Sequence, residues 1–565
     1  MAAVFLLTAT FLFVLWQNSQ IAILWDLSYL LDTSWRIALG QVPYRGFPIV
    51  HPPLTFVLQA AIMRVAGRHY LLHVAYAALT GALGTVVSWR IILRILRGQI
   101  RSAWIVSLLL AAPLTVLGIY SIYPHPIYDC DAAFAILIAI FLLQRLELSG
   151  SGWWKPLFTS AALVVPIFFK QNMGLPFLLI AVAGICLLLV LHWTARWRHA
   201  DLAPAASSSS SSSSLLKLLA GIAVASALAL VLIQATFGIG NYLRWTVHFA
   251  AERRLPGFAD MVAIYQQPSF AWTLPCVAGG LLLLCLPIAQ RLWARFLAFD
   301  LLSAPLIGSI VFLFLDDDLD ERGDNLLALW PMLLLLAAVV ALIELRKGIT
   351  LGRLLPFFVL AAIHGTFLSQ QLWGSTYAIW PLLMLLIAWM LAAIPASARW
   401  LVPAVASVVC VTFLVCGGLY AAGHDRMNYL QIPNQPVSRA SLPALRGMAD
   451  RGPYLADWEE LVRFTSAEIP LQDGILLLPG EEPFYFATGR TPQFPVQIFD
   501  RTTDPYSAQE LIAEAQRRNI RWVILKTRLQ STEDPLPEAA ETHRLIAQEF
   551  ALYRKLAGYD VYRRK

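Results

Sequence analysis

The first apolar segment of the chain is followed by Trp25-Asp-Leu-Ser-Tyr-Leu-Leu-Asp-Thr-Ser-Trp-Arg-Ile-Ala-Leu-Gly40, which is polar and carries two acids and an arginine. Roughly the first four hundred residues are otherwise mostly lipid-soluble, so ionisable groups next to a membrane need a functional reason. Asp26 lies where a helix is expected to leave the bilayer, and an unpaired carboxylate there can take a proton from a hydroxyl. The pattern favours a membrane-embedded enzyme over a passive channel.

The composition indicates a polytopic membrane protein. Of the 565 residues, 58% are hydrophobic and 14% are charged, whereas a soluble protein has about 25% charged residues. The mean hydropathy is +0.64. The 19 Trp and 18 Tyr residues suit aromatic belts at the two membrane interfaces. The net charge of +7 comes from arginines in alternate short loops, so the expected partners are membrane lipids and not nucleic acid.

Apolar segments predict about thirteen membrane spans, which put the two termini on opposite sides of the membrane. The basic loops all fall on one side under this count, and the positive-inside rule makes that side cytoplasmic. Residues 54–65 are apolar but too short to cross, and they are predicted to form an interfacial or re-entrant helix. The predicted spans are residues 3–24, 70–89, 103–121, 131–144, 157–169, 174–192, 216–236, 271–289, 297–315, 326–343, 352–368, 378–394 and 399–420.

The chain divides into a transmembrane domain, residues 1–422, and a C-terminal domain, residues 423–565. The transmembrane domain contains the first external loop, 25–53, and a serine-rich stretch, 201–215, which is predicted to be a flexible cytoplasmic linker. In the C-terminal domain, strands alternate with amphipathic helices, which is typical of a small α/β domain. It is expected to lie outside the cytoplasm. Its predicted strands are 474–479, 521–526 and 559–563, and its predicted helices are 507–518 and 542–556.

Asp26 and Asp32 are the candidate catalytic carboxylates. Asp26 is either only the N-cap of the helix that follows or a general base at the mouth of a cavity. Asp32 precedes Arg36 by four residues, so an ion pair within the helix would occupy it. The two acids lie about 120° apart around a helix, which argues against a shared proton. Asp26 is therefore the preferred base.

The order of an apolar span, Asp26, Gly40, residues 43–47 (PYRGF) and residues 52–54 (PPL) resembles the first external loop of the GT-C glycosyltransferases. This superfamily includes protein O-mannosyltransferases, the aminoarabinose transferases of lipid A and other lipopolysaccharide-modifying enzymes. The resemblance implies a mainly α, polytopic GT-C-like bundle with a small external α/β domain. It also implies that a sugar moves from a polyprenyl-phosphate donor to an acceptor hydroxyl with inversion. Asp26 occupies the position of the catalytic carboxylate of that family.

The resemblance leaves the acceptor open, so a glycan, a lipid or a protein is expected. Leu27 and Gly46 stand where relatives often carry acids, which argues against a metal site in this loop. The sequence shows no glycine-rich phosphate loop, so nothing in it indicates a nucleotide cofactor. A divalent cation is the one cofactor left open, because Asp316, Asp318 and Asp320 could ligate one, although such an acidic run is more often a solvated turn.

A phosphate leaving group near lipid requires cations or N–H donors. Lys170, with its neighbours Gln171 and Asn172, is a candidate to bind the phosphate. Alternatively, Lys170 only extends its ammonium group to the membrane interface. Arg253 and Arg254 lie in a basic, aromatic loop that either covers a lipid headgroup or only anchors at the interface. The remaining candidate substrate-binding residues are Arg36, Tyr44, Arg45, His51, His125, Asp129, Arg322, Trp373 and Tyr377, all predicted on the Asp26 face.

A lipid or glycolipid transporter, or flippase, is the alternative function. Transporters place ionisable groups near the membrane midplane and often contain repeated halves. Here the spans are nearly free of charge and the polar groups gather at one external face, so a transferase is favoured. The external face carries no Asn-x-Ser/Thr acceptor site and the chain no organellar signal, which favours a bacterial inner membrane with a periplasmic active face.

Overall fold

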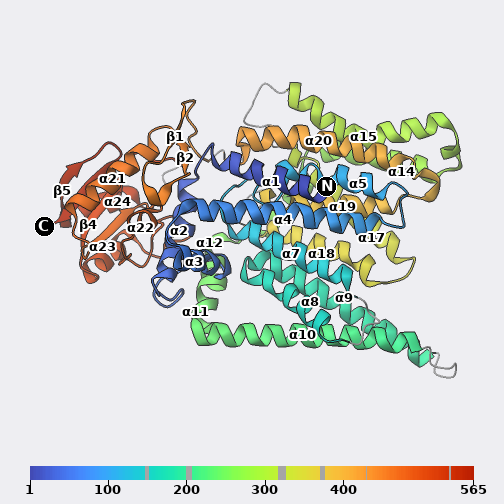
Figure 1. Ribbon diagram of the computed structural model, residues 1–565, viewed down its shortest axis with the longest axis horizontal. Helices are drawn as coiled ribbons and strands as arrows, with labels where there is room; N and C mark the ends of the chain where they lie inside the picture. Colours follow the sequence, from blue (N-terminus) through green and yellow to red (C-terminus); the bar gives the residue numbers. More distant parts are fainter. Residues whose placement is uncertain are drawn as a thin grey trace.

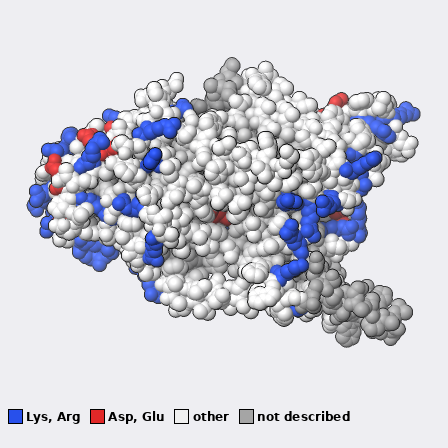
Figure 2. All heavy atoms as spheres, in the orientation of Figure 1, with Lys and Arg blue, Asp and Glu red and all other residues white. Residues whose placement is uncertain are grey.

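The structure is a computed structural model, and it describes residues 1–146, 152–198, 206–315, 326–369, 376–427, 429–532, 536 and 538–565. Long helices run side by side along the long axis of the molecule, and a C-terminal sheet domain covers one end of the bundle (Figure 1). We call the end beside the sheet domain the outer end and the opposite one the inner end. Figure 2 shows Lys and Arg gathered towards these two ends of the visible face, with an almost uncharged zone between them.

Each of the thirteen predicted spans coincides with a helix of the bundle. By length and composition, five described segments could cross a membrane: Tyr70–Leu96, Gln171–Ala195, Ser212–Thr236, Leu292–Leu315 and Leu401–Met427. The total of thirteen crossings stays a prediction. The helices are α1 (Ala2–Asn18), α4 (Tyr70–Leu96), α5 (Ala103–Ala111) with α6 (Leu114–Leu117), α7 (Tyr128–Arg145), α8 (Trp154–Val164) with the 3₁₀ turn Val165–Phe168, α9 (Gln171–Arg198), α10 (Ala206–Thr236), α14 (Phe270–Cys285), α15 (Leu292–Leu315), α17 (Trp330–Leu345), α18 (Leu351–Thr366), α19 (Trp380–Ala392) and α20 (Leu401–Gly423).

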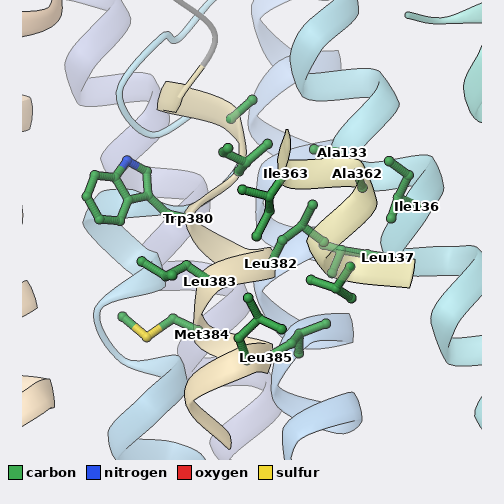
Figure 3. Close-up of a cluster of buried hydrophobic side chains, with 14 of the residues drawn as sticks. Ala133, Ile136, Leu137, Ala362, Ile363, Trp380, Leu382, Leu383, Met384 and Leu385 are labelled. Atoms are coloured by element: carbon green, nitrogen blue, oxygen red, sulfur yellow. The ribbon is translucent and has the colours of Figure 1, made fainter. Parts of the chain in front are cut away.

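The core of the bundle surrounds α19, which is buried over most of its length. Figure 3 shows Leu382 of α19 close to Leu137 of α7 and Ile363 of α18. Small residues let helix backbones approach one another closely in membranes. Gly365 of α18 is such a residue, because a Cβ there would overlap the carbonyl oxygen of Asn172 on α9. This crossing fixes the start of α9 at the outer end.

A layer of short helices lies between the bundle and the sheet domain. The helix α2 (Leu24–Ala38) follows α1 after a short turn, and α3 (Leu54–Ala66) is the predicted short apolar helix. A chain of short helices follows α10: α11 (Ile239–Leu243), the π-helical turn Arg244–Phe249, α12 (Ala250–Arg254), α13 (Phe258–Val262) and the 3₁₀ turn Ala263–Gln266.

The C-terminal domain contains a four-stranded sheet of order β3-β4-β6-β5. The strands β3 and β4 pair in parallel, and the other two pairs are antiparallel. Ser507 and Glu510 form the capping box that starts α23, as the sequence predicts. The strands and helices are β1 (Val437–Arg439), β2 (Ala449–Arg451), α21 (Tyr454–Glu468), β3 (Gly474–Leu478), α22 (Phe484–Thr488), α23 (Ala508–Arg517), β4 (Ile520–Lys526), α24 (Ala539–Glu549), β5 (Phe550–Lys555) and β6 (Tyr559–Arg564).

Two local predictions were wrong. The predicted helix 542–556 ends at Glu549, and the chain continues as β5 because these residues pair with β6 at the sheet edge. The serine-rich stretch was predicted to be flexible, but α10 begins at Ala206 and includes the eight serines. Adding residues to an existing helix is much easier than nucleating one, so the apolar segment that follows extends its helix into the serines. Residues 201–205 lie outside the described part of the chain.

Candidate active site

Asp26 lies in the first turn of α2, at the outer end of the bundle. The N-cap position belongs to Ile23, so capping alone does not explain the carboxylate. Instead, its Oδ2 accepts hydrogen bonds from the hydroxyls of Tyr123 and Tyr429, the latter at 2.9 Å. The residue is half-buried, and no hydrogen bond from the described residues reaches Oδ1. One oxygen is thus held in place while the other remains available.

The surroundings raise the pKa of the Asp26 carboxyl above its ordinary value of 3.8. Burial is the largest cause, because it disfavours the charged form, and the negative charge of Asp129 acts in the same direction. The two tyrosine hydroxyls and the positive charge of Arg426 oppose this shift without cancelling it. A carboxylate with a raised pKa is a better proton acceptor near neutral pH.

Aromatic side chains form one wall beside Asp26. Tyr123 stacks on Tyr377 with ring centroids 4.9 Å apart, and the guanidinium of Arg426 lies 5.6 Å from the Tyr377 ring. These residues come from three segments: the loop before α7, the 3₁₀ turn before α19 and the residues that follow α20. The wall is therefore assembled only when the whole bundle has folded.

Lys170 and Arg254 form a cationic cluster with the residues around them. Lys170 and Asp129 form an ion pair, and their relative exposures are only 6% and 2%. The ammonium of Lys170 also lies 5.4 Å from the ring of Tyr128, which stacks on His51 at 3.9 Å. Arg254 donates a hydrogen bond to Nε2 of His51 at 2.9 Å. The negative charge of Asp129 contributes to the raised pKa of Asp26, which indicates that the cationic cluster lies near Asp26 at the outer end.

His51 is neutral in this arrangement. Because an arginine always donates, Nε2 of His51 must accept from Arg254, and Nδ1 then carries the proton towards the hydroxyl of Tyr29 at 3.0 Å. The pKa of His51 is well below 6.5, first because the ring is buried and then because Arg254 and Lys170 are positively charged. The imidazole can orient Arg254 but holds no positive charge of its own.

Asp32 and Arg36 face the C-terminal domain. The carboxylate oxygens of Asp32 accept the backbone N–H groups of Tyr485 and Phe486, at 3.1 and 2.7 Å, at the start of α22. Arg36 is 1% exposed and donates to the side chain of Gln497 at 2.8 Å. The predicted ion pair within the helix is therefore wrong, because a domain more than 400 residues further along the chain supplies both side chains with other partners.

Other predicted site residues hold loops in place. Tyr44 donates to the carbonyl of His51 at 2.7 Å, and Arg45 donates to the carbonyl of Phe237 at 2.9 Å. Arg253 reaches the C-terminal domain, where it donates to the carbonyls of Arg501 and Asp504. These contacts connect the first external loop, the α10–α12 segment and the sheet domain.

His125 supports the turn before α2. Its Nε2 accepts the backbone N–H of Ile23 at 3.3 Å, and its Nδ1 faces the hydroxyl of Tyr70 at 3.1 Å. Burial lowers the pKa of this histidine to about 3, so the ring is neutral. Gln171 donates to the carbonyl of Thr246 at 2.9 Å, and its buried Oε1 has no hydrogen-bond partner among the described residues.

Five predicted residues lie outside the described part of the chain: Arg322, Trp373, Asp316, Asp318 and Asp320. Among the described residues, no group of three or more His, Cys, Asp or Glu side chains is arranged to hold a metal ion.

The structure adds three residues to the neighbourhood of Asp26 that were not predicted. Tyr429 and Arg426 follow α20 directly, and their position after the last predicted span, on the face of Asp26, is a signal that the sequence offered. Gln530 could not be found in this way. Its side chain accepts the N–H of Leu24 at 3.1 Å and donates to the carbonyl of Ala22 at 2.9 Å, so it fixes the turn that carries Asp26.

Comparisons with known proteins give similarity in structure alone. No family model matches the sequence, and no curated protein matches it significantly. The whole chain, with its bundle, its α2–α3 layer and the sheet domain at one end, has a fold that is also found in a solved structure. The particular structure that it resembles is ArnT from Cupriavidus metallidurans bound to undecaprenyl phosphate, with a TM-score of 0.51, 12% sequence identity, and coverage of 99% of this chain and 97% of that chain.

The oligosaccharyltransferase of Archaeoglobus fulgidus, crystallised in complex with Zn and sulfate, gives a TM-score of 0.46 at 11% identity, over 99% of this chain and 73% of that chain. At 12% identity, the likeness to ArnT establishes the fold alone.

Proposed function

We propose that this protein is a membrane-embedded glycosyltransferase that moves a sugar from a polyprenyl-phosphate donor to an acceptor hydroxyl. The observation that carries the proposal is the half-buried Asp26 carboxylate, which has one oxygen available and lies near the cationic cluster of Lys170 and Arg254. The acceptor is a glycan, a lipid or a protein. The GT-C fold supports this assignment, and the undecaprenyl phosphate bound to the ArnT neighbour supports a lipid-phosphate donor.

The proposed reaction is a single inverting displacement. The acceptor oxygen forms a bond with the anomeric carbon while the bond from that carbon to the phosphate oxygen breaks. The electron pair of the broken bond leaves with the polyprenyl phosphate, and the acceptor proton passes to Oδ1 of Asp26. The raised pKa of Asp26 suits this role, because general bases work best when their pKa approaches the working pH.

Lys170 and Arg254 would stabilise the charge that develops on the leaving phosphate. Preorganised cations in a site that excludes water are among the largest contributions to catalysis. Asp129 and the neutral His51 hold the two cations in position. Asp32 is not a second base in this scheme, because its oxygens already accept backbone N–H groups; it is a positioning residue for α2.

The outer end would face the periplasm of a bacterium, and the basic inner end would face the cytoplasm. This orientation follows the positive-inside rule and places the sheet domain, Asp26 and the acceptor on the same side. The divalent cation that the acidic residues 316–320 would hold is not needed for any step above.

The test uses the purified full-length protein in proteoliposomes, with radiolabelled polyprenyl-phosphate sugars and a membrane extract of acceptors. Three proteins are compared: wild type, Asp26→Asn and a control, Glu468→Gln. Glu468 is a surface carboxylate of the C-terminal domain that contacts Tyr553 and Arg554, so the control makes the same chemical change away from the site.

Transfer of label to a new species by wild type and the control, but not by Asp26→Asn, is the expected result. Equal transfer by all three proteins would rule out Asp26 as the base. If label crosses the bilayer chemically unchanged, and does so equally with all three proteins, the protein is a flippase and the proposed enzymatic function is wrong.

A further inference from the structure

A hollow lies at the inner end of the bundle, remote from Asp26. It has a volume of about 700 Å³ and lies among the ends of α4, α7, α17, α18 and α19. The helix α4 runs between the two ends, and its 27 residues correspond to about 40 Å. Pockets that bind small molecules have volumes of about 300–1,000 Å³. We call this hollow the inner cavity.

The walls of the inner cavity are strongly basic. Arg94, Lys347, Arg353 and Arg399 line it, and Glu344 is the only acid among its described lining residues. Glu344 pairs with Lys347 at 2.5 Å. The side chains of Arg94 and Arg399 have no hydrogen-bond or ion-pair partner among the described residues. Figure 2 shows basic side chains gathered at this end of the visible face.

Two polar atoms in the wall are enclosed without a partner. They are Nε of Arg399 and Oε1 of Gln144, each hidden from solvent and without a hydrogen bond among the described residues. Leaving a buried polar group unpaired is costly, and such groups therefore indicate a missing ligand or water. A basic residue at a helix C-terminus complements the helix dipole, but Arg399 lies just before the start of α20, so the dipole does not account for its enclosed nitrogen.

The helix α18 starts in the same wall. Thr350, its N-cap, and Leu351, Gly352 and Arg353 of its first turn all line the cavity. The first N–H groups of a helix lack partners within the helix, so a helix N-terminus attracts anions such as phosphate. Here the 16-residue helix and the arginines present positive charge to one space.

The rest of the wall is apolar. Leu143, Leu355, Leu386, Trp389 and Met390 contribute hydrocarbon and aromatic surface to the same cavity. A small soluble anion would leave this apolar surface exposed to water, whereas an amphiphile with an anionic phosphate head and a hydrocarbon chain would cover it. The cavity also lies at the end of the apolar zone, where the headgroups of one leaflet are expected.

We propose that the inner cavity is a binding site for the phosphate headgroup of an anionic phospholipid from the leaflet at the inner end. Arg94, Arg353 and Arg399 bind the phosphate oxygens together with the first turn of α18, and the apolar wall contacts the first carbons of the chains. The site is separate from Asp26 and does not depend on the proposed glycosyl transfer.

The test measures binding of a short-chain fluorescent phosphatidylglycerol to the full-length protein in a neutral detergent. The cavity variant is R94Q/R353Q/R399Q. Its control is R97Q/R101Q/R346Q, which removes three exposed arginines at the same end that do not line the cavity. The single variant R399Q is measured as well, in case the triple variant does not fold. Phosphatidylcholine and inorganic phosphate are used as competitors.

We expect the cavity variant to bind phosphatidylglycerol about tenfold or more weakly than wild type, and the control to bind within about threefold of it. R399Q should weaken binding by a smaller factor. Phosphatidylcholine should compete poorly because it carries no net charge. An equal loss in both triple variants would overturn the proposal, because binding would then report only surface charge. Displacement by inorganic phosphate as effectively as by lipid would also overturn it and indicate a site for a free anion.

Discussion

The first and second halves of α2 carry similar side chains and use them differently. In the first turn, the Asp26 carboxylate meets two tyrosine hydroxyls on one oxygen and leaves the other available. In the second half, Asp32 has both oxygens bonded to backbone N–H groups and Arg36 is buried against the C-terminal domain. One helix therefore joins the proposed base to the contacts that hold the helix in place.

The difference shows how a carboxylate's partners decide its role. Tyrosine hydroxyls leave a carboxylate basic enough to accept a proton when burial opposes its charge. Backbone N–H groups at a helix start use up both oxygens and make the carboxylate a connection between domains. The following predictions test this division of labour, in order of decreasing effect.

Asp26→Asn should lower kcat/KM for sugar transfer by about 10²–10⁴-fold, which is the usual contribution of a general base. The amide oxygen can still accept the hydrogen bonds from Tyr123 and Tyr429 but cannot take up the acceptor proton. The melting temperature in detergent should stay within a few degrees of wild type. If Asp26→Asn retains the kcat/KM of wild type, the proposal that Asp26 is the general base is wrong.

Asp32→Ala should destabilise the contact between α2 and the C-terminal domain by about 2–4 kcal/mol, because two buried N–H groups lose their acceptor. The measurement is thermal unfolding of the detergent-solubilised protein together with limited proteolysis near Phe484–Thr488. Asp32→Asn should have a smaller effect, since its amide oxygen can keep one N–H. Unchanged stability in Asp32→Ala would contradict the structural role.

Arg254→Gln should lower kcat/KM by about 10–100-fold, since it removes one charge next to the leaving phosphate. Arg253→Gln is its matched control, because Arg253 donates to carbonyls of the C-terminal domain and lies over the ring of Phe249. We expect the control to change kcat/KM by less than about threefold. Equal losses in both variants would mean that the loop is an anchor and Arg254 has no direct part in transfer.

Tyr429→Phe should have the smallest effect at alkaline pH and a visible one in acid. The active form of Asp26 is deprotonated, so kcat/KM falls as pH drops through its pKa, which lies above 3.8. The Tyr429 hydroxyl lowers that pKa, and its removal should raise it. The acid limb of the profile of kcat/KM against pH should therefore move to higher pH. If the limb does not move, the Tyr429 hydroxyl does not influence the pKa of the base.

Much of the fold could be predicted from local pattern. Each predicted span coincides with a helix because a run of apolar residues near lipid has few other ways to satisfy its backbone. The errors arose where pattern is ambiguous or neighbours decide. Residues 550–555 continue a helical pattern but form a strand, because β6 offers an edge to pair with. The serines lack any core-forming pattern but adopt the helix of the segment beside them.

The candidate site could be predicted only in part. Asp26 stands out because an acid directly follows an apolar span, and Lys170 and Arg254 because a phosphate leaving group near lipid requires cations. The stacking of Tyr128 on His51 and the contact of Tyr429 with Asp26 join residues 77 and 403 positions apart. No spacing rule connects such residues, because their meeting depends on how the helices pack.

The contacts of Gln530 with Ala22 and Leu24 can form only late in synthesis of the chain, long after Asp26 has been added. The Leu24–Gln530 pair spans 506 positions, and at about 5–20 residues per second a ribosome needs about 25–100 s to cover that interval. During that interval Asp26 is already in the growing chain while the residue that fixes its turn does not yet exist. A prematurely terminated chain would carry Asp26 without the contacts of Gln530, so the turn that positions the proposed base would not be fixed.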